Sequence, residues 1–148
     1  MKALDVAKYF IELANEESEH DLTNLKLQKL LYYAQGKHLI ANGDILFDDA
    51  VEAWRYGPVV NEVYHALKQC GQFPVTVFDI EIEHAPLGEE AKRSVEDVWE
   101  RIGKVYSGGY LVDKTHADGA PWQRFYREGE NVEIPNDTIA AYLRRHAL

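Results

Sequence analysis

The sequence predicts a mainly α-helical fold: a single compact multi-helix domain, residues 1–148, with a minor short β or extended component. Over most of the chain, apolar residues recur at steps of three and four, the spacing of amphipathic helices. A chain of 148 residues fits one domain. The hydrophobic content of 46% and the charged content of 28% are ordinary for a globular protein, so the composition does not indicate disorder.

Two amphipathic helices are predicted in the first third of the chain, over residues 3–17 and from a cap at Asp21 or Thr23 to Ala41. Gly43 follows the second helix as its C-terminal stop. This second helix contains the adjacent residues Tyr32 and Tyr33. Neighbouring residues point about 100° apart on a helix, so at least one tyrosine should lie off the centre of the apolar stripe.

Short extended pieces are predicted next. Residues 45–47 and 51–54 flank Asp48 and Asp49, which suggests a small hairpin with the two aspartates in its turn. Pro58 suits the first position of a further helix, which should run to about Cys70. Residues 75–83 are rich in β-branched side chains and are predicted as a strand or an extended connector.

The remaining sequence returns to helical spacing. One helix is predicted over residues 88–106, with Val105 in its apolar stripe, and Ser107 is a candidate cap for a short helix to about His116. Pro121 is placed to open another short helix, and Asn136 is a candidate cap for the last one.

Charge and cysteine content restrict the function. There are 16 Lys and Arg against 25 Asp and Glu, giving a net charge of −9, which argues against nucleic acid as the main ligand. Cys70 is the single cysteine, so an internal disulfide is excluded and a reducing compartment is favoured. With no signal peptide and no long apolar run, we expect a cytoplasmic protein that does not span a membrane.

The sequence contains no assembled catalytic or metal-binding motif, and no cofactor is expected. Lys29 lies in the most apolar helix; its ammonium group either sits over Tyr32, Tyr33 or Trp54, sits against an acidic group, or snorkels along the helix edge. His116 either belongs to a pocket or is bonded to the backbone where two helices meet. Exposed aromatic residues beside an arginine are good binding anchors, whereas buried ones form core, and both alternatives remain open.

Three blocks of sequence carry a family resemblance. They are LQKLLYYAQ with Lys29, Tyr32 and Tyr33; EAWRYGPVV with Trp54, Arg55, Tyr56, Gly57 and Pro58; and a weaker block with Thr115, His116, Pro121 and Trp122. In this order, and over nearly the whole chain, they resemble the Panacea domain of SocA-like antitoxins, which include prophage-associated proteins. The named residues are the shared family framework and possible partner-binding positions.

The resemblance implies a non-enzymatic domain that binds and neutralises a cognate protein toxin, usually encoded beside it. In the SocA branch it also implies an adaptor that delivers the toxin to a ClpXP-type protease. The net acidity would complement a basic toxin through an aromatic patch with an acidic rim. The residues leave one rival hypothesis, a hydrolase that uses His116 with an acidic residue. The leading hypothesis requires the Trp54–Tyr56 arm to bend at Gly57 and pack on the Lys29–Tyr33 helix.

Overall fold

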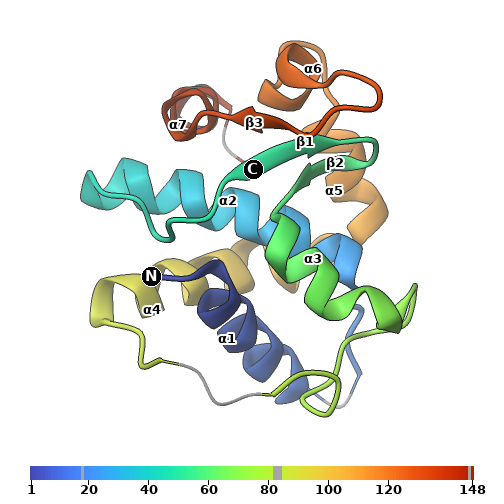
Figure 1. Cartoon of the computed structure of the whole chain (residues 1–148). Coiled ribbons are helices and arrows are strands. Elements are labelled where there is room, and N and C mark those ends of the chain that lie inside the picture. The colour runs from blue at the N-terminus through green and yellow to red at the C-terminus, as the bar shows by residue number, and fades with distance from the viewer. Residues whose placement is uncertain (18, 82–84, 147) are drawn as a thin grey trace.

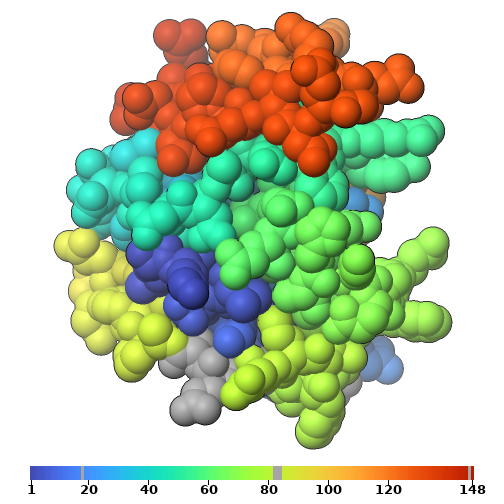
Figure 2. Space-filling view, viewed as in Figure 1, coloured from blue at the N-terminus to red at the C-terminus, as the bar shows by residue number. Residues whose placement is uncertain are grey.

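A computed structural model describes residues 1–17, 19–81, 85–146 and 148. Its architecture is mainly helical, as predicted, with α2 at the centre and the other elements around it (Figure 1). The helices in this part of the chain are α1 (Ala3–Asn15), α2 (Asn24–Asn42), α3 (Asn61–Leu67), α4 (Glu89–Val98), α5 (Gly108–Thr115), α6 (Pro121–Phe125) and α7 (Asn136–Arg145). In Figures 1 and 2, α1 lies between α3 and α4. No helix within the described ranges combines the length and the apolarity needed to cross a membrane.

Both ends of α2 form as the sequence predicts. The Thr23 hydroxyl oxygen accepts a hydrogen bond from the backbone N–H of Lys26 at 3.2 Å, which caps the helix. At the other end, Gly43 adopts a left-handed φ of 74°, and its N–H bonds to the carbonyl of Leu39.

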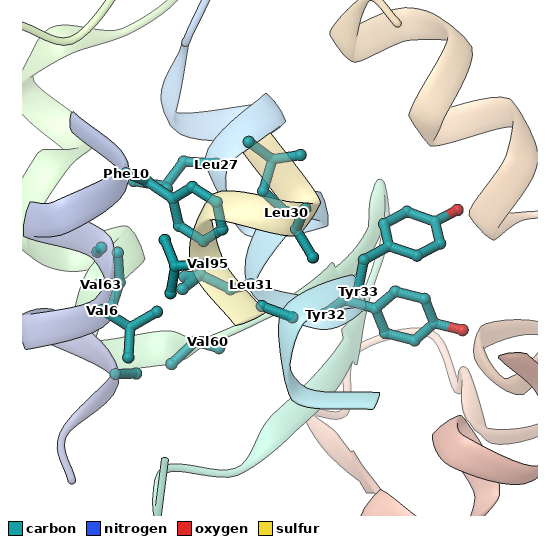
Figure 3. Close-up of a cluster of buried hydrophobic side chains, with 14 of the residues drawn as sticks. Val6, Phe10, Leu27, Leu30, Leu31, Tyr32, Tyr33, Val60, Val63 and Val95 are labelled. Carbon is teal, nitrogen blue, oxygen red and sulfur yellow. The ribbon is translucent and has the colours of Figure 1, made fainter. Parts of the chain in front are cut away.

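Neighbouring elements cover α2 on opposite sides. Side chains such as Phe10 and Val6 of α1 pack on one side, whereas Tyr32 and Tyr33 lie on the other (Figure 3). Both tyrosines therefore lie off the main apolar stripe. They are still buried, with exposed fractions of 2% and 4%, because α5 and α7 cover that side. Because neighbouring elements cover α2 on these sides, the residues in the middle of the helix are buried.

A small antiparallel sheet packs beside α2. It consists of β1 (Val51–Trp54), β2 (Gly57–Val59) and β3 (Val132–Ile134) in the order β2-β1-β3. Trp54 pairs with Gly57, so Arg55 and Tyr56 form the turn of the β1–β2 hairpin. Val51 pairs with Ile134, which brings the chain before α7 to the other edge of β1.

The prediction of a hairpin around Asp48 and Asp49 is wrong. Residues 45–47 form no strand, because the side chain of Gln35 forms hydrogen bonds with the backbone of Leu46 and Phe47. Its Oε1 accepts from the N–H of Leu46 at 2.8 Å and of Phe47 at 3.3 Å, and its Nε2 donates to the carbonyl of Phe47 at 2.8 Å. Residues 51–54 pair instead with β2 on one side and with β3 on the other.

The prediction that Pro58 opens a helix is also wrong. Pro58 lies in β2, an edge strand where its missing N–H is tolerated, and α3 begins only at Asn61. The helix then ends near the predicted point: α3 passes into a 3-10 turn, Lys68–Cys70, and Gly71 follows with a φ of 57°.

No strand forms over residues 75–81, and residues 82 and 83 of that prediction lie outside the described residues. The N–H of Val75 bonds to the carbonyl of Leu22 at 2.7 Å, and Asp79 accepts from the N–H of Thr76 in a tight turn. Phe78 is 94% exposed. The β-branched run therefore has backbone partners in a helix-linking segment rather than in a sheet.

The predicted C-terminal helices form with small differences. α4 continues as a π-helical turn, Trp99–Gly103, and ends before Val105, which is 60% exposed instead of lying in the apolar stripe. Ser107 caps α5 by accepting from the N–H of Tyr110 at 3.1 Å, and Pro121 opens α6. Asn136 does not cap α7; it is the first helical residue, and Pro135 holds the cap position.

Candidate protein-binding site

Apart from Tyr32 and Tyr33, which α5 and α7 cover, the residues named in the three sequence blocks meet at the β1–β2 hairpin. Their side chains reach it from two sides: from α2 below, and from α5 and α6 beside its turn. Lys29, Trp122 and His116 each contact a backbone carbonyl of the hairpin, at Pro58, Trp54 and Arg55 respectively. The blocks therefore fix the conformation of the hairpin and leave the side chains at its turn exposed.

From α2, polar side chains hold β2 and the start of α3. The Lys29 ammonium donates to the carbonyl of Pro58 at 3.1 Å, and the N–H of Val60 donates to Gln28 Oε1 at 2.9 Å. Asn24 donates through Nδ2 to the carbonyl of Tyr64 at 3.2 Å, and its Oδ1 accepts from Gln28 Nε2. It is therefore β2, which begins at the bend at Gly57, that packs on α2. The Trp54–Tyr56 arm before the bend is contacted through its carbonyls by Trp122 and His116.

The environment of Lys29 differs from every arrangement predicted for it. Its side chain is fully buried, so it does not snorkel, and its hydrogen bond goes to a carbonyl rather than to a carboxylate. Within the described ranges, no cation–π contact involves this ammonium group. Burial lowers the pKa of Lys29 to about 7, because the charged form loses its hydration without gaining an anionic partner.

Gly57 is the closest point between the hairpin and its support. Its φ is 114°, in the region that favours glycine. A β-carbon there would lie 2.8 Å from Lys29 Cε and 3.1 Å from Thr115 Oγ1. The backbone angle therefore favours glycine at this position, and an added β-carbon would also force the Lys29 side chain to shift.

Two aromatic side chains of the third block hold the turn itself. Trp122 donates its indole N–H to the carbonyl of Trp54, and His116 Nε2 lies 3.3 Å from the carbonyl oxygen of Arg55. The His116 Nδ1 lies 2.6 Å from the carbonyl oxygen of Val112. The His116 ring packs edge-on against the Trp122 ring, with 3.8 Å between the ring centres. Backbone bonding is thus the arrangement found for His116. Both ring nitrogens of this half-buried side chain face backbone carbonyl oxygens.

The ten candidate residues divide by exposure. Five are buried: Lys29, Tyr32, Tyr33, Gly57 and Pro58. Three are half-buried, namely Trp54, His116 and Trp122, and two are exposed, Arg55 and Tyr56. The exposed fraction of Tyr56 is 60%. Among these ten residues, the exposed ones are therefore the two that form the hairpin turn.

A groove of about 410 Å3 lies beside this turn, and we call it the tip groove. Its lining comes from α2 (Asn24, Leu25, Gln28), the hairpin (Trp54, Arg55, Tyr56, Val59) and the end of α3 with the turn after it (Tyr64, Lys68, Gly71, Gln72). In Figure 2, the green hairpin turn and the yellow-green segment after α3 project on the same side of the molecule. The Trp54 ring packs edge-on against Tyr64 with 5.0 Å between ring centres, which makes one wall of the groove.

Sequence reasoning missed Asn24, Gln28 and Gln35, which hold the backbone around α2. All three are buried and hydrogen-bonded. Their spacings of four and seven residues place them on one face of the helix. Buried polar side chains normally have hydrogen-bond partners. A row of polar residues on one face of the most apolar helix was therefore the signal in the sequence that these side chains bind neighbouring segments.

Replacing Gln35 by leucine should lower the free energy of unfolding by about 2 kcal/mol, because the N–H groups of Leu46 and Phe47 and the carbonyl of Phe47 lose their partner. Urea unfolding followed by tryptophan fluorescence measures the change. The matched control is Gln69→Leu, an exposed glutamine, which should shift the free energy by less than about 0.5 kcal/mol. Equal effects of the two substitutions would contradict the role assigned to Gln35.

Fold and site together define a small helical domain that holds a hairpin rigidly and exposes its turn. Residues 27–123 match the family described as "Antitoxin SocA-like, Panacea domain", and the chain belongs to this family. It is also 33% identical over 110 residues to Antitoxin SocA of Caulobacter vibrioides (strain NA1000 / CB15N). That alignment covers 68% of this chain and 58% of the relative, so the chain spans little more than half of the relative's length. No solved structure matches the chain. The family predicted from the three blocks is confirmed.

Proposed function

We propose that this chain is an antitoxin that neutralises a cognate protein toxin by direct, stoichiometric binding in the cytoplasm. The observation that carries the proposal is the family match over residues 27–123, which contains all three blocks that hold the hairpin. A domain whose shared residues fix one exposed turn is suited to presenting that turn to another polypeptide. We expect the toxin to be encoded next to this chain.

The site supports binding rather than turnover. In the part of the chain that the structure describes, no three His, Cys, Asp or Glu side chains gather in a way that would hold a metal ion. His116 is engaged by two backbone carbonyls and by Trp122. We propose that neutralisation consists in covering the toxin's working surface.

Co-expression with the adjacent gene tests the proposal. The neighbouring product alone should arrest growth, and the pair should restore growth and copurify. In a purified assay of the toxin without any protease, full inhibition should need one chain per toxin. A neighbouring product that is harmless and does not copurify would contradict the proposal, and inhibition at far lower ratios would indicate an enzyme instead.

The same strains separate a blocker from an adaptor for a ClpXP-type protease. If the chain only blocks the toxin, the toxin's half-life in cells should be unchanged or longer when the chain is present. A toxin half-life that shortens with the chain, and only in cells that contain the protease, would assign the adaptor role.

A further inference from the structure

We propose that the tip groove binds a segment of the toxin in which a large apolar side chain is flanked by carboxylates. This inference rests on the proposed function and adds the face that is used and the chemistry that it recognises. Three properties of the groove support it: its exposed apolar residues, the sign of its charges and the rigidity of its walls.

Large apolar side chains are exposed in and beside the groove. Leu25 at one side is 40% exposed, and Tyr56 at the turn is 60% exposed. Phe73, directly after the lining residue Gln72, is 77% exposed. Exposed aromatic and aliphatic side chains grouped around a hollow are typical of protein-binding sites, where one buried anchor contributes much of the affinity.

The charges of the groove have the opposite sign to those of the whole chain. The chain carries −9, yet the ionised side chains among the lining residues are Arg55 and Lys68, and none of these residues is Asp or Glu. The Arg55 guanidinium lies 5.5 Å from the centre of the Tyr56 ring. In the described part of the chain, neither cation forms an ion pair. Two available cations beside an apolar hollow complement carboxylates.

This local charge reverses the expectation of an acidic rim that receives a basic toxin. At the tip groove, a basic segment would meet Arg55 and Lys68 and would be repelled. The strongly acidic remainder of the chain also opposes nucleic acid, whose phosphates would gain only two cations here. An acidic, apolar polypeptide segment is the occupant that fits both the hollow and its charges.

The walls of the groove are fixed before a partner arrives. Lys29 bonds to the carbonyl of Pro58 in β2, and Gln28 bonds to Val60 just before α3. Trp122 and His116 contact the carbonyls of Trp54 and Arg55 at the turn. Prior ordering of this kind reduces the entropy lost on association. The exposed side chains at the turn then meet the partner on a backbone that does not need to rearrange.

The test compares two double variants that change the net charge equally. Arg55→Glu/Lys68→Glu reverses the charge of the groove, and the matched control Arg93→Glu/Arg144→Glu reverses two exposed arginines on α4 and α7 that do not line it. The probe is the purified product of the adjacent gene, and the dissociation constant is measured by calorimetry. We expect the groove variant to bind at least about 10-fold more weakly, and the control to change by less than about 3-fold.

A second pair of variants tests the anchor. Tyr56→Ala should weaken binding about 10-fold, whereas Tyr56→Phe should keep the ring and most of the affinity. Because Arg55, Tyr56 and Lys68 are exposed, all variants should keep the wild-type unfolding midpoint, which is measured alongside. If Arg55→Glu/Lys68→Glu lowers the unfolding midpoint, it is replaced by the milder Arg55→Gln/Lys68→Gln pair, for which a smaller loss of affinity is expected.

The outcomes separate the two proposals. If wild-type protein binds the probe and the groove variants bind equally well or more tightly, the groove assignment is overturned and the antitoxin proposal stands. Stronger loss in the Arg93→Glu/Arg144→Glu control would likewise place the contact on another face. If wild-type protein does not bind the probe at all, the antitoxin proposal fails, and the groove inference fails with it.

Discussion

The free energy of unfolding should rise by up to about 4 kcal/mol between pH 7 and pH 10, and this rise should depend on Lys29. The pKa of Lys29 is about 7 in the folded chain, against 10.5 for an unperturbed lysine. Between these values the unfolded chain binds a proton that the folded chain does not. Stability therefore increases with pH by up to about 1.4 kcal/mol per pH unit. Below pH 7 both states carry the proton, and the full cost of burying the charge is present.

The control for this prediction is Lys29→Met, which keeps the length of the buried side chain and removes the ammonium group. The variant loses the hydrogen bond to the carbonyl of Pro58, at a cost of about 1 kcal/mol, but it should lose the pH-dependent rise as well. Urea unfolding of both proteins at each pH unit from 7 to 10 measures the difference. Parallel curves would show that Lys29 does not titrate in this range.

The upper limit of that window has a physical reason. Burial raises the pKa of Tyr32 and Tyr33 above that of free tyrosine, and burial together with Glu96 raises the pKa of Tyr9 to about 12. Above pH 10 the unfolded chain loses these protons before the folded chain does, so the tyrosines lower stability as pH rises. They act equally in wild type and in Lys29→Met, and the difference between the two curves still isolates the lysine.

Much of the helical architecture could be predicted because its signals are local. Caps such as Thr23 and Ser107, the stop at Gly43 and the opening proline of α6 act through bonds or angles within one turn of chain. α1 and α4 each bury a single apolar face, so the spacing of their apolar residues is enough to predict them. These elements formed as predicted.

The errors occurred where a distant side chain decides the backbone. Residues 45–47 are not a strand because Gln35 binds their peptide groups, and Pro58 is held in β2 by Lys29 and by pairing with Ala53. Neither partner is adjacent in sequence. An extended apolar run and a Gly-Pro pair each suit more than one structure, and tertiary contacts choose between them.

The sequence could not predict which of the candidate residues are buried as supports and which are exposed. The three blocks contain the hairpin turn and the Lys29, His116 and Trp122 side chains that contact its backbone, yet nothing in them separates the buried Lys29 from the exposed Arg55. Both are cations beside aromatic residues. The separation follows from burial on α2, and it leaves the turn and the tip groove as the surface through which we propose that the toxin is bound.

Replacing Gly57 by alanine should lower the free energy of unfolding by about 3 kcal/mol, because two costs act at one position. The φ of 114° strains any residue with a β-carbon, and that carbon would lie 2.8 Å from Lys29 Cε. The matched control is Gly43→Ala: its φ is also positive, at 74°, but nothing lies within 4 Å of an added β-carbon. The control should therefore cost only about 1 kcal/mol.

A double variant tests whether the close approach to Lys29 contributes as described. Shortening the lysine in Lys29→Ala removes the atom that the new β-carbon would meet. Gly57→Ala should then cost about 1 kcal/mol less in that background than in the wild type, a coupling that urea unfolding resolves. Additive costs would mean that the backbone angle alone requires glycine. Coupled costs would mean that the hairpin and α2 are fitted to each other at this point, through the contact between Gly57 and the Lys29 side chain.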